Sequence, residues 1–330
     1  MNTSNLESKI IEAQEAETNG NYMAAASYYK EALQTARELQ ESKSIKFCKT
    51  KLVELNKKSL VEMKKLEVTH EFTDQEQKWI KDFIIVFLKQ SDKSISLRFI
   101  GLTPYLMPKV SDVKNMSKDM PIFYLFGNTN TISEEGHNIR GGSENNISWY
   151  MQMYKISIEN ITVLNICKIL YMLMYNNNYS MNMKITELTD YFSRSKIIDG
   201  KKLKIVLTGI KKYYKKDYIT ALHILVPQFE ALLLNVAQKN GIDVIALERD
   251  KNPSTRLVVL SEQHLKKDEF KKLFGEDFCQ QVQFVLFEPL GFRLRHKIAH
   301  GEITEDECNF SNTTLIIYLY LVLMARFDIK

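Results

Sequence analysis

A short stretch near the C-terminus, Gly291–Glu302 (GFRLRHKIAHGE), holds the side chains of this sequence that are best suited to chemistry. It places Arg295, His296 and His300 close together, although the whole chain has only 6 histidines. An arginine guanidinium stays charged and matches the oxygens of a phosphate. A histidine can move protons near neutral pH. The stretch therefore indicates a reaction at a phosphate group.

The spacing of these residues predicts one short helix that ends at a glycine. His296 and His300 are four positions apart, which puts them on one face. Arg295 and His300 are five positions apart, about 140° around an ideal helix, so only the long arginine side chain lets both groups reach one phosphate. Gly301 is expected to end the helix and to leave His300 at its edge, in a cleft.

Arginine and histidine side chains placed in this way can cleave RNA without a metal ion. One group takes the proton from a ribose 2′-hydroxyl, and another protonates the leaving 5′-oxygen. The arginine stabilises the crowded phosphorane that forms between these steps. The expected products are a 2′,3′-cyclic phosphate and a 5′-hydroxyl, and this chemistry requires no cofactor.

The same residues resemble a known family. Arg295–His300 (RHKIAH) fits the R-x4-6-H signature of HEPN domains (higher eukaryote and prokaryote nucleotide-binding), in which Asn, Asp or His commonly follows the arginine. The longer stretch GFRLRHKIAHG is similar to a prokaryotic HEPN-like family of uncharacterised domains with the signature G-x-x-L-R-x-x-x-A-H-G. A helix similar to Asp217–Leu233 precedes that signature. The resemblance covers about residues 200–330 and leaves the N-terminal 180 uncovered.

This resemblance implies a fold, an activity and a role for each residue. HEPN domains are small helical bundles, and many are metal-independent RNases of toxin or phage-defence systems. They usually act as dimers whose two motifs face each other across the interface. On this basis Arg295 stabilises the phosphate, His300 is the acid or base, and His296 orients them or contacts the phosphate.

Glu230 is a further candidate for the site. It lies on the apolar helix predicted upstream of the motif, where an unpaired carboxylate is costly to bury. Pairing with Arg295 would satisfy the carboxylate and fix the guanidinium. The alternative is that Glu230 faces solvent.

Other interpretations of the motif remain open. His296 and His300 have the spacing of two metal ligands, but Lys297 stands where the HExxH pattern has glutamate, and a lysine beside a metal is unfavourable. A purely structural role is another alternative, with Arg295 capping carbonyl groups. The chain would then be a non-catalytic HEPN-like scaffold that dimerises or binds nucleotide.

Positive charge near the motif and upstream of it favours RNA as the partner. Arg293 and Lys297 flank the catalytic candidates. Between Lys201 and Lys216 there are seven lysines and no acidic residue. Lysines neutralise phosphates and tyrosines stack on bases, which makes part of this run a candidate RNA surface: Lys211, Lys212, Tyr213, Tyr214, Lys215 and Lys216. The alternative is a solvated lysine face.

The elements that must position the motif form an antiparallel bundle of four or five helices at 184–330. Apolar residues recur at helical spacing in the helix before the motif: Leu222, Leu225, Val226, Phe229, Leu232, Leu233 and Val236. Pro227 predicts a kink or break in this helix, and Gly241 its end. Residues 242–256 are expected to be a connector, Gly275 to break the next helix, and the apolar segment 312–327 to form a closing core helix.

The N-terminal segment, 1–66, resembles one tetratricopeptide-type helical hairpin. The match lies in small and aromatic residues that let two helices approach closely: Ala16, Gly20, Tyr22, Ala25, Tyr29, Ala32, Leu33 and Ala36. A further helix is expected at 45–66. The alternative is an ordinary helical hairpin. The resemblance implies that this segment docks on the rest of the chain or on a protein partner.

The middle segment, 67–183, is mixed. Residues 73–76 (TDQE) predict a capped helix start, and helix is predicted again from about Ile147 to Tyr175. Between them, 127–146 is rich in Gly, Asn and Ser and is expected to be a long exposed loop. Residues 176–182 are expected to be a connector. The overall expectation is a mainly all-α fold.

Composition narrows the remaining choices. The 330 residues are 45 % hydrophobic and 26 % charged, with a net charge of +5, which permits nucleic-acid binding without requiring it. The four cysteines form no CxxC pair, which favours reduced thiols in a cytoplasmic protein. Two apolar stretches, Ile161–Tyr175 and Leu315–Ala325, are interpreted as core helices and not as membrane spans.

Overall fold

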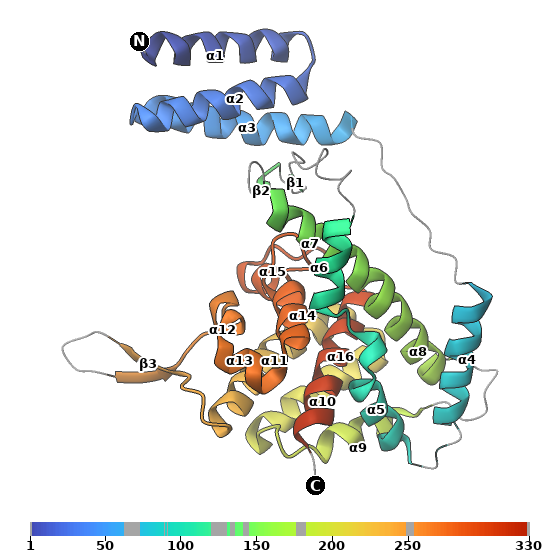
Figure 1. Cartoon of the computed structure of the whole chain (residues 1–330). Helices are drawn as coiled ribbons and strands as arrows, with labels where there is room; N and C mark the ends of the chain where they lie inside the picture. Colours follow the sequence, from blue (N-terminus) through green and yellow to red (C-terminus); the bar gives the residue numbers. More distant parts are fainter. Residues whose placement is uncertain are drawn as a thin grey trace. The chain divides into compact units, whose positions relative to one another are not determined.

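The structure is a computed structural model that describes residues 2–62, 73–88, 90, 92–119, 131–132, 136–140, 145–175, 183–248 and 254–328. Regular structure in these residues is almost entirely helical (Figure 1). The mainly all-α fold predicted from the sequence is therefore confirmed. Two compact units are present, Met1–Glu71 with Ile122–Ser148, and Phe72–Pro121 with Trp149–Lys330. The middle segment of the sequence thus contributes to both.

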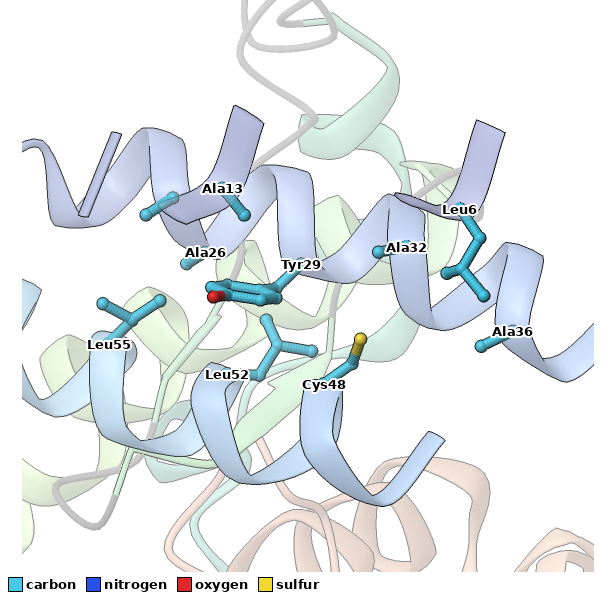
Figure 2. Packing of buried hydrophobic residues seen from close by; sticks show 10 residues of the cluster. Leu6, Ala13, Ala26, Tyr29, Ala32, Ala36, Cys48, Leu52 and Leu55 are labelled. Carbon is cyan, nitrogen blue, oxygen red and sulfur yellow. The ribbon is translucent and has the colours of Figure 1, made fainter. Parts of the chain in front are cut away.

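The first unit contains α1 (Asn2–Thr18), α2 (Tyr22–Glu38) and α3 (Ser42–Glu62), with α2 packed against both neighbours. Gly20, at φ 74°, turns the chain between α1 and α2, and the side chain of Asn21 caps α2. Tyr29 of α2 is buried among Leu52 and Leu55 of α3 (Figure 2). The helical hairpin and the following helix predicted here are confirmed.

A short β-hairpin belongs to the same unit. β1 (Thr131–Ile132) pairs antiparallel with β2 (Asn138–Arg140). Buried Gly136 lies between the strands, and its carbonyl accepts a hydrogen bond from Asn56 Nδ2 of α3 at 2.8 Å. A Cβ at Gly136 would lie 2.3 Å from the Val53 carbonyl oxygen. The exposed loop predicted at 127–146 is therefore wrong for this hairpin, while residues 127–130, 133–135 and 141–144 lie outside the described part.

The second unit is a helical bundle around α16 (Phe310–Phe327), in which every residue from Thr313 to Ala325 is buried. The predicted core helix is confirmed. α5, α8 and α11 all contact α16, so the bundle predicted for 184–330 also needs helices from the middle segment. A Cβ at Gly101 of α5 would lie 2.2 Å from the Leu321 carbonyl oxygen, which shows how closely the two backbones approach.

The other helices of this unit, α7 starting in the first unit's last residues, follow in chain order. They are α4 (Asp74–Leu88), α5 (Lys93–Leu102), η1 (Pro104–Leu106), α6 (Val110–Asp119), α7 (Asn145–Ser157), η3 (Ile158–Val163), α8 (Leu164–Tyr175), α9 (Ile185–Ser193), α10 (Gly200–Tyr214), α11 (Tyr218–Lys239), α12 (Glu262–Lys266), α13 (Asp268–Phe274), α14 (Glu276–Leu286) and α15 (Leu294–His300).

Local sequence signals in the middle segment correspond to observed helix ends. Thr73 and Glu76 form the predicted capping box of α4, with the Thr73 N–H donating to Glu76 Oε2 at 2.9 Å and the Glu76 N–H donating to Thr73 Oγ1 at 3.3 Å. The helix predicted from Ile147 to Tyr175 is confirmed as one continuous run through α7, the π-helical η3 and α8. The connector predicted at 176–182 lies outside the described residues.

Two expectations about the C-terminal region are wrong. α11 continues through Pro227 to Lys239, so the expected break is not there, although Gly241, at φ 83°, follows its end as predicted. The connector predicted at 242–256 contains β3 (Ile245–Glu248), paired antiparallel with β4 (Ser254–Leu257). Alternation of apolar residues in 244–248 was the signal for a strand. Gly275, at φ 88°, separates α13 from α14 as expected.

Three described stretches are long and apolar enough, by length and composition, to cross a membrane: Tyr150–Tyr175, Tyr218–Lys239 and Phe310–Phe327. The third is the core helix α16. The first supplies buried residues to the same bundle from α8: Ile166, Ile169, Leu170, Leu173 and Met174. Both stretches that were interpreted as core helices thus line the bundle interior.

Candidate active site

The candidate residues lie on and around α15, which is held between sharply defined turns. A Cβ at Gly291 would lie 2.1 Å from the Phe284 carbonyl oxygen, so only glycine lets the chain pass α14 at this point. Arg293, at φ 53°, then turns the backbone into α15. Gly301, at φ 68°, ends the helix, and its N–H caps the carbonyls of Ile298 and Lys297, as the sequence predicts.

Arg295 is paired with Glu230 of α11, and the predicted pairing is confirmed. The Arg295 Nε donates to Glu230 Oε2 at 3.2 Å, and the other carboxylate oxygen accepts the Leu260 N–H at 2.9 Å. The two side chains are 26 % and 16 % exposed, so the pair lies at the edge of the core and reaches solvent. The Phe287 ring, 6.0 Å from the Arg295 guanidinium carbon, adds a cation–π contact.

This pairing uses only one of the three guanidinium nitrogens. Among the described residues, the terminal nitrogens Nη1 and Nη2 of Arg295 have no hydrogen-bond partner. They form the fork that binds two oxygens of a phosphate. Glu230 therefore fixes the guanidinium through Nε and leaves its fork available.

The two histidines lie side by side, as their spacing predicts. The ring centroids of His296 and His300 are 4.3 Å apart. His300 is exposed at the end of α15, whereas His296 is half-buried. An Arg293 terminal nitrogen lies 2.6 Å from His296 Nε2, and Glu302 Oε1 lies 3.6 Å from the same nitrogen. Since a guanidinium only donates, His296 Nε2 accepts this bond and the ring carries its proton on Nδ1.

Electrostatics reinforce the neutral form of His296. Desolvation is the main cause that lowers the pKa of His296, and the positive charge of Arg293 lowers it further. His300 and Arg295 act in the same direction, and Glu302 opposes them. His296 is therefore an electrostatic neighbour of both catalytic candidates. This position suits the supporting role that the resemblance implies.

The flanking cations, predicted to bind nucleic acid, each have a carboxylate partner. Arg293 Nη1 lies 3.6 Å from Glu302 Oε2. Lys297 Nζ donates to Glu307 Oε1, and the Thr304 N–H donates to the other oxygen of Glu307 at 3.1 Å. These carboxylates reduce the positive charge that either residue offers to a phosphate.

The aromatic part of the second predicted RNA surface is wrong. Tyr213 is fully buried, stacked on Phe310 at 5.9 Å and hydrogen-bonded to Thr314 at 2.8 Å, so it cannot stack on a base. Tyr214 is half-buried, and its hydroxyl donates to the Met183 carbonyl. The positions at which these tyrosines stand in α10 decide this outcome, because one face of that helix packs against α11.

The lysines of the same run divide into two groups. Lys212 pairs with Asp217 at 2.8 Å, and Lys216 lies over the Tyr175 ring at 4.8 Å. Lys211 and Lys215 are exposed. The structure thus leaves only two of the four predicted lysines without a nearby protein group among the described residues.

Several residues of the site could not be found from the motif alone. Glu302 and Glu307 lie just beyond the motif, and no spacing rule singles them out. The Leu260 N–H and the Phe287 ring come from separate loops. Among the described residues, no group of three or more His, Cys, Asp or Glu side chains could hold a metal ion.

The chain was compared with protein-family models, curated proteins and solved structures. None of the three comparisons gives a match.

Proposed function

We propose that the chain is a metal-independent endoribonuclease of the HEPN type. One observation carries the proposal: Arg295 is held through its Nε by Glu230, with its terminal nitrogens free, beside a pair of stacked histidines of which His300 is exposed. A fixed, unoccupied guanidinium fork next to a titratable imidazole is the pairing that cleavage by a ribose 2′-hydroxyl requires.

Each residue then has a distinct role. Arg295 binds the phosphate and stabilises the phosphorane. His300 transfers the proton, because it is the histidine with access to solvent. His296 orients His300 by ring contact, and Glu230 positions Arg295. A second copy of the chain, with its α15 facing the first, would supply the other acid or base, as the resemblance implies.

The resemblance also places this activity in a toxin or phage-defence setting in the cytoplasm. The helical hairpin α1–α2 is then the segment that receives a protein partner. Neither statement depends on the geometry of α15, and each needs a separate test.

A non-catalytic scaffold is the alternative. The observation that favours it is that Arg293 and Lys297 are each engaged by a carboxylate, which gives the motif a structural use. In this alternative α15 fastens α14 to α11, and the bundle dimerises or binds nucleotide.

The two functions are separated by incubating the purified chain with mixed RNAs in EDTA. The nuclease predicts cleavage that gives 2′,3′-cyclic phosphate and 5′-hydroxyl ends, and that is lost in both Arg295→Ala and His300→Ala. Absence of cleavage by the unaltered chain at every RNA, salt and pH tested, with a stable fold, would favour the scaffold. Cleavage that EDTA abolishes would overturn the metal-free mechanism.

A further inference from the structure

The second unit has a cleft of about 530 Å³ that is separate from the candidate active site. It lies between α5, the segment after α9 and the C-terminal end of α16. In Figure 1 these elements are near the C-terminus of the bundle, away from α15. Its lining consists of Ser94, Ile95, Arg98, Tyr191, Arg194, Ser195, Lys196, Met324 and Asp328.

The frame of this cleft is well fixed. Asp328 Oδ1 accepts the N–H groups of Lys196 at 2.8 Å and Ile197 at 3.1 Å, which fastens the segment after α9 to the end of α16. The Ile197 carbonyl in turn accepts a hydrogen bond from Asn235 of α11 at 3.2 Å. On the other side, α5 lies against α16 through the close contact at Gly101. The walls therefore come from four elements of one core.

The polar lining of the cleft is mainly cationic. Arg98, Arg194 and Lys196 are exposed, and none of them forms an ion pair with a described carboxylate. Asp328 is the carboxylate in the lining, and its Oδ1 is already engaged by two backbone N–H groups. Asp92, the N-cap of α5, is an electrostatic neighbour of Arg194 and offsets part of its charge. The balance remains positive.

Two further features favour an anion over a second protein surface. The Oγ atom of Ser195 is buried and has no hydrogen-bond partner among the described residues, which leaves a hydroxyl donor at the cleft wall. The first turn of α5 supplies Ser94 and Ile95, so the positive end of that helix dipole faces the cleft. The volume also falls within the roughly 300–1,000 Å³ typical of small-molecule sites.

We propose that this cleft binds a small molecule through a phosphate group. Two guanidinium groups and one ammonium group match the oxygens and the double charge of a phosphate monoester or pyrophosphate. Tyr191, Ile95 and Met324 provide an apolar wall for an organic substituent. The proposal is independent of the nuclease activity, since none of these residues belongs to the site on α15.

The test is calorimetric titration of the full chain with pyrophosphate and with adenosine monophosphate. Saturable binding is expected, weakened at least about tenfold by Arg98→Gln or by Arg194→Gln, because each removes a charge-assisted pair. The matched control is Arg37→Gln, the same charge change on exposed Arg37 of α2, and it should leave affinity unaltered. Both arginines in the cleft are exposed, so circular dichroism should show unchanged melting.

The two ligands distinguish the source of the phosphate. Equal affinity would assign a free inorganic anion, and tighter binding of the nucleotide would assign an organic phosphate; either result supports the cleft. Absence of saturable binding by both ligands would overturn the proposal. So would binding that only RNA oligonucleotides show, or binding that persists in both cleft variants and is lost in Arg295→Ala.

Discussion

The two regions that the sequence marks as RNA-binding, α15 and α10, use their polar residues in different ways. On α15, Glu230 holds Arg295 and leaves the guanidinium fork free, while His300 reaches solvent. On α10, Tyr213 is buried against Phe310 and takes part in the core. Residues of similar chemical types are thus arranged around an open position in one helix and consumed by packing in the other.

This difference shows that residue type alone does not identify a binding surface. A tyrosine buries its ring when its position faces the bundle, whatever the charge of its neighbours. A carboxylate placed behind an arginine orients that arginine without covering it. The four predictions below sharpen or break this contrast, beginning with the largest expected effect.

Tyr213→Ala should destabilise the second unit by about 3–5 kcal/mol, because it removes a fully buried ring. The more conservative Tyr213→Phe should cost about 1 kcal/mol through loss of the hydrogen bond to Thr314. Urea unfolding measures both. A Tyr213→Ala chain with unaltered stability and weaker RNA binding would restore the stacking role.

Glu230→Gln should lower the rate of RNA cleavage about tenfold, since the charge that fixes Arg295 is lost. The glutamine oxygen can still accept the Leu260 N–H, so the fold should be retained. The measurement is the cleavage rate at saturating RNA, with thermal unfolding as the control. A cleavage rate equal to that of the unaltered chain would show that Arg295 needs no such positioning.

Replacing both exposed lysines of α10, Lys211→Gln with Lys215→Gln, should reduce RNA affinity mainly at low salt. The slope of log K against log salt should fall in magnitude by about 1.4, the value for two phosphate contacts on a single strand. Filter binding over a range of salt measures it. An unchanged slope would indicate that these lysines form only a solvated face.

The smallest effect concerns pH. The pKa of His296 is lowered in the folded chain, chiefly by desolvation. As pH falls through about 6.5, the unfolded chain therefore takes up a proton that the folded chain resists, and the free energy of unfolding decreases. Above this window both states are neutral and the effect is absent.

His296→Asn should remove this contribution, so the variant should lose less stability than the unaltered chain between pH 7.5 and pH 5.5. Urea unfolding at both pH values measures the difference. His264, whose pKa is also lowered, mainly by desolvation, remains in both proteins and serves as a constant background. An equal loss in the two proteins would show that His296 titrates alike in the folded and unfolded chains.

Local signals in the sequence were sufficient for much of the fold. The capping box at Thr73 and Glu76, the stop at Gly301 and the apolar segment of α16 each depend on neighbours in sequence, and each was predicted. Pro227 was misleading, because α11 continues past it inside a packed bundle. The contribution of α5 and α8 to the bundle was missed because it depends on contacts between segments far apart in the chain.

The candidate site shows the same division. The Glu230–Arg295 pair was predicted from the cost of burying a lone carboxylate, which is a general physical argument. The partners Glu302 and Glu307 were not predicted, because their contacts depend on how the chain turns after Gly301. The burial of Tyr213 depends on which face of α10 meets Phe310, and a run of lysines carries no information about that.

The rate of RNA cleavage in EDTA at saturating RNA tests the central contrast most directly. The chains to compare are the unaltered protein, His300→Ala, and the double variant at Lys211 and Lys215. Loss of an acid or base at α15 should slow cleavage by about 100-fold or more, while the α10 variant should stay within about twofold. A His300→Ala chain that cleaves as fast as the unaltered protein would contradict the assignment of the active site to α15.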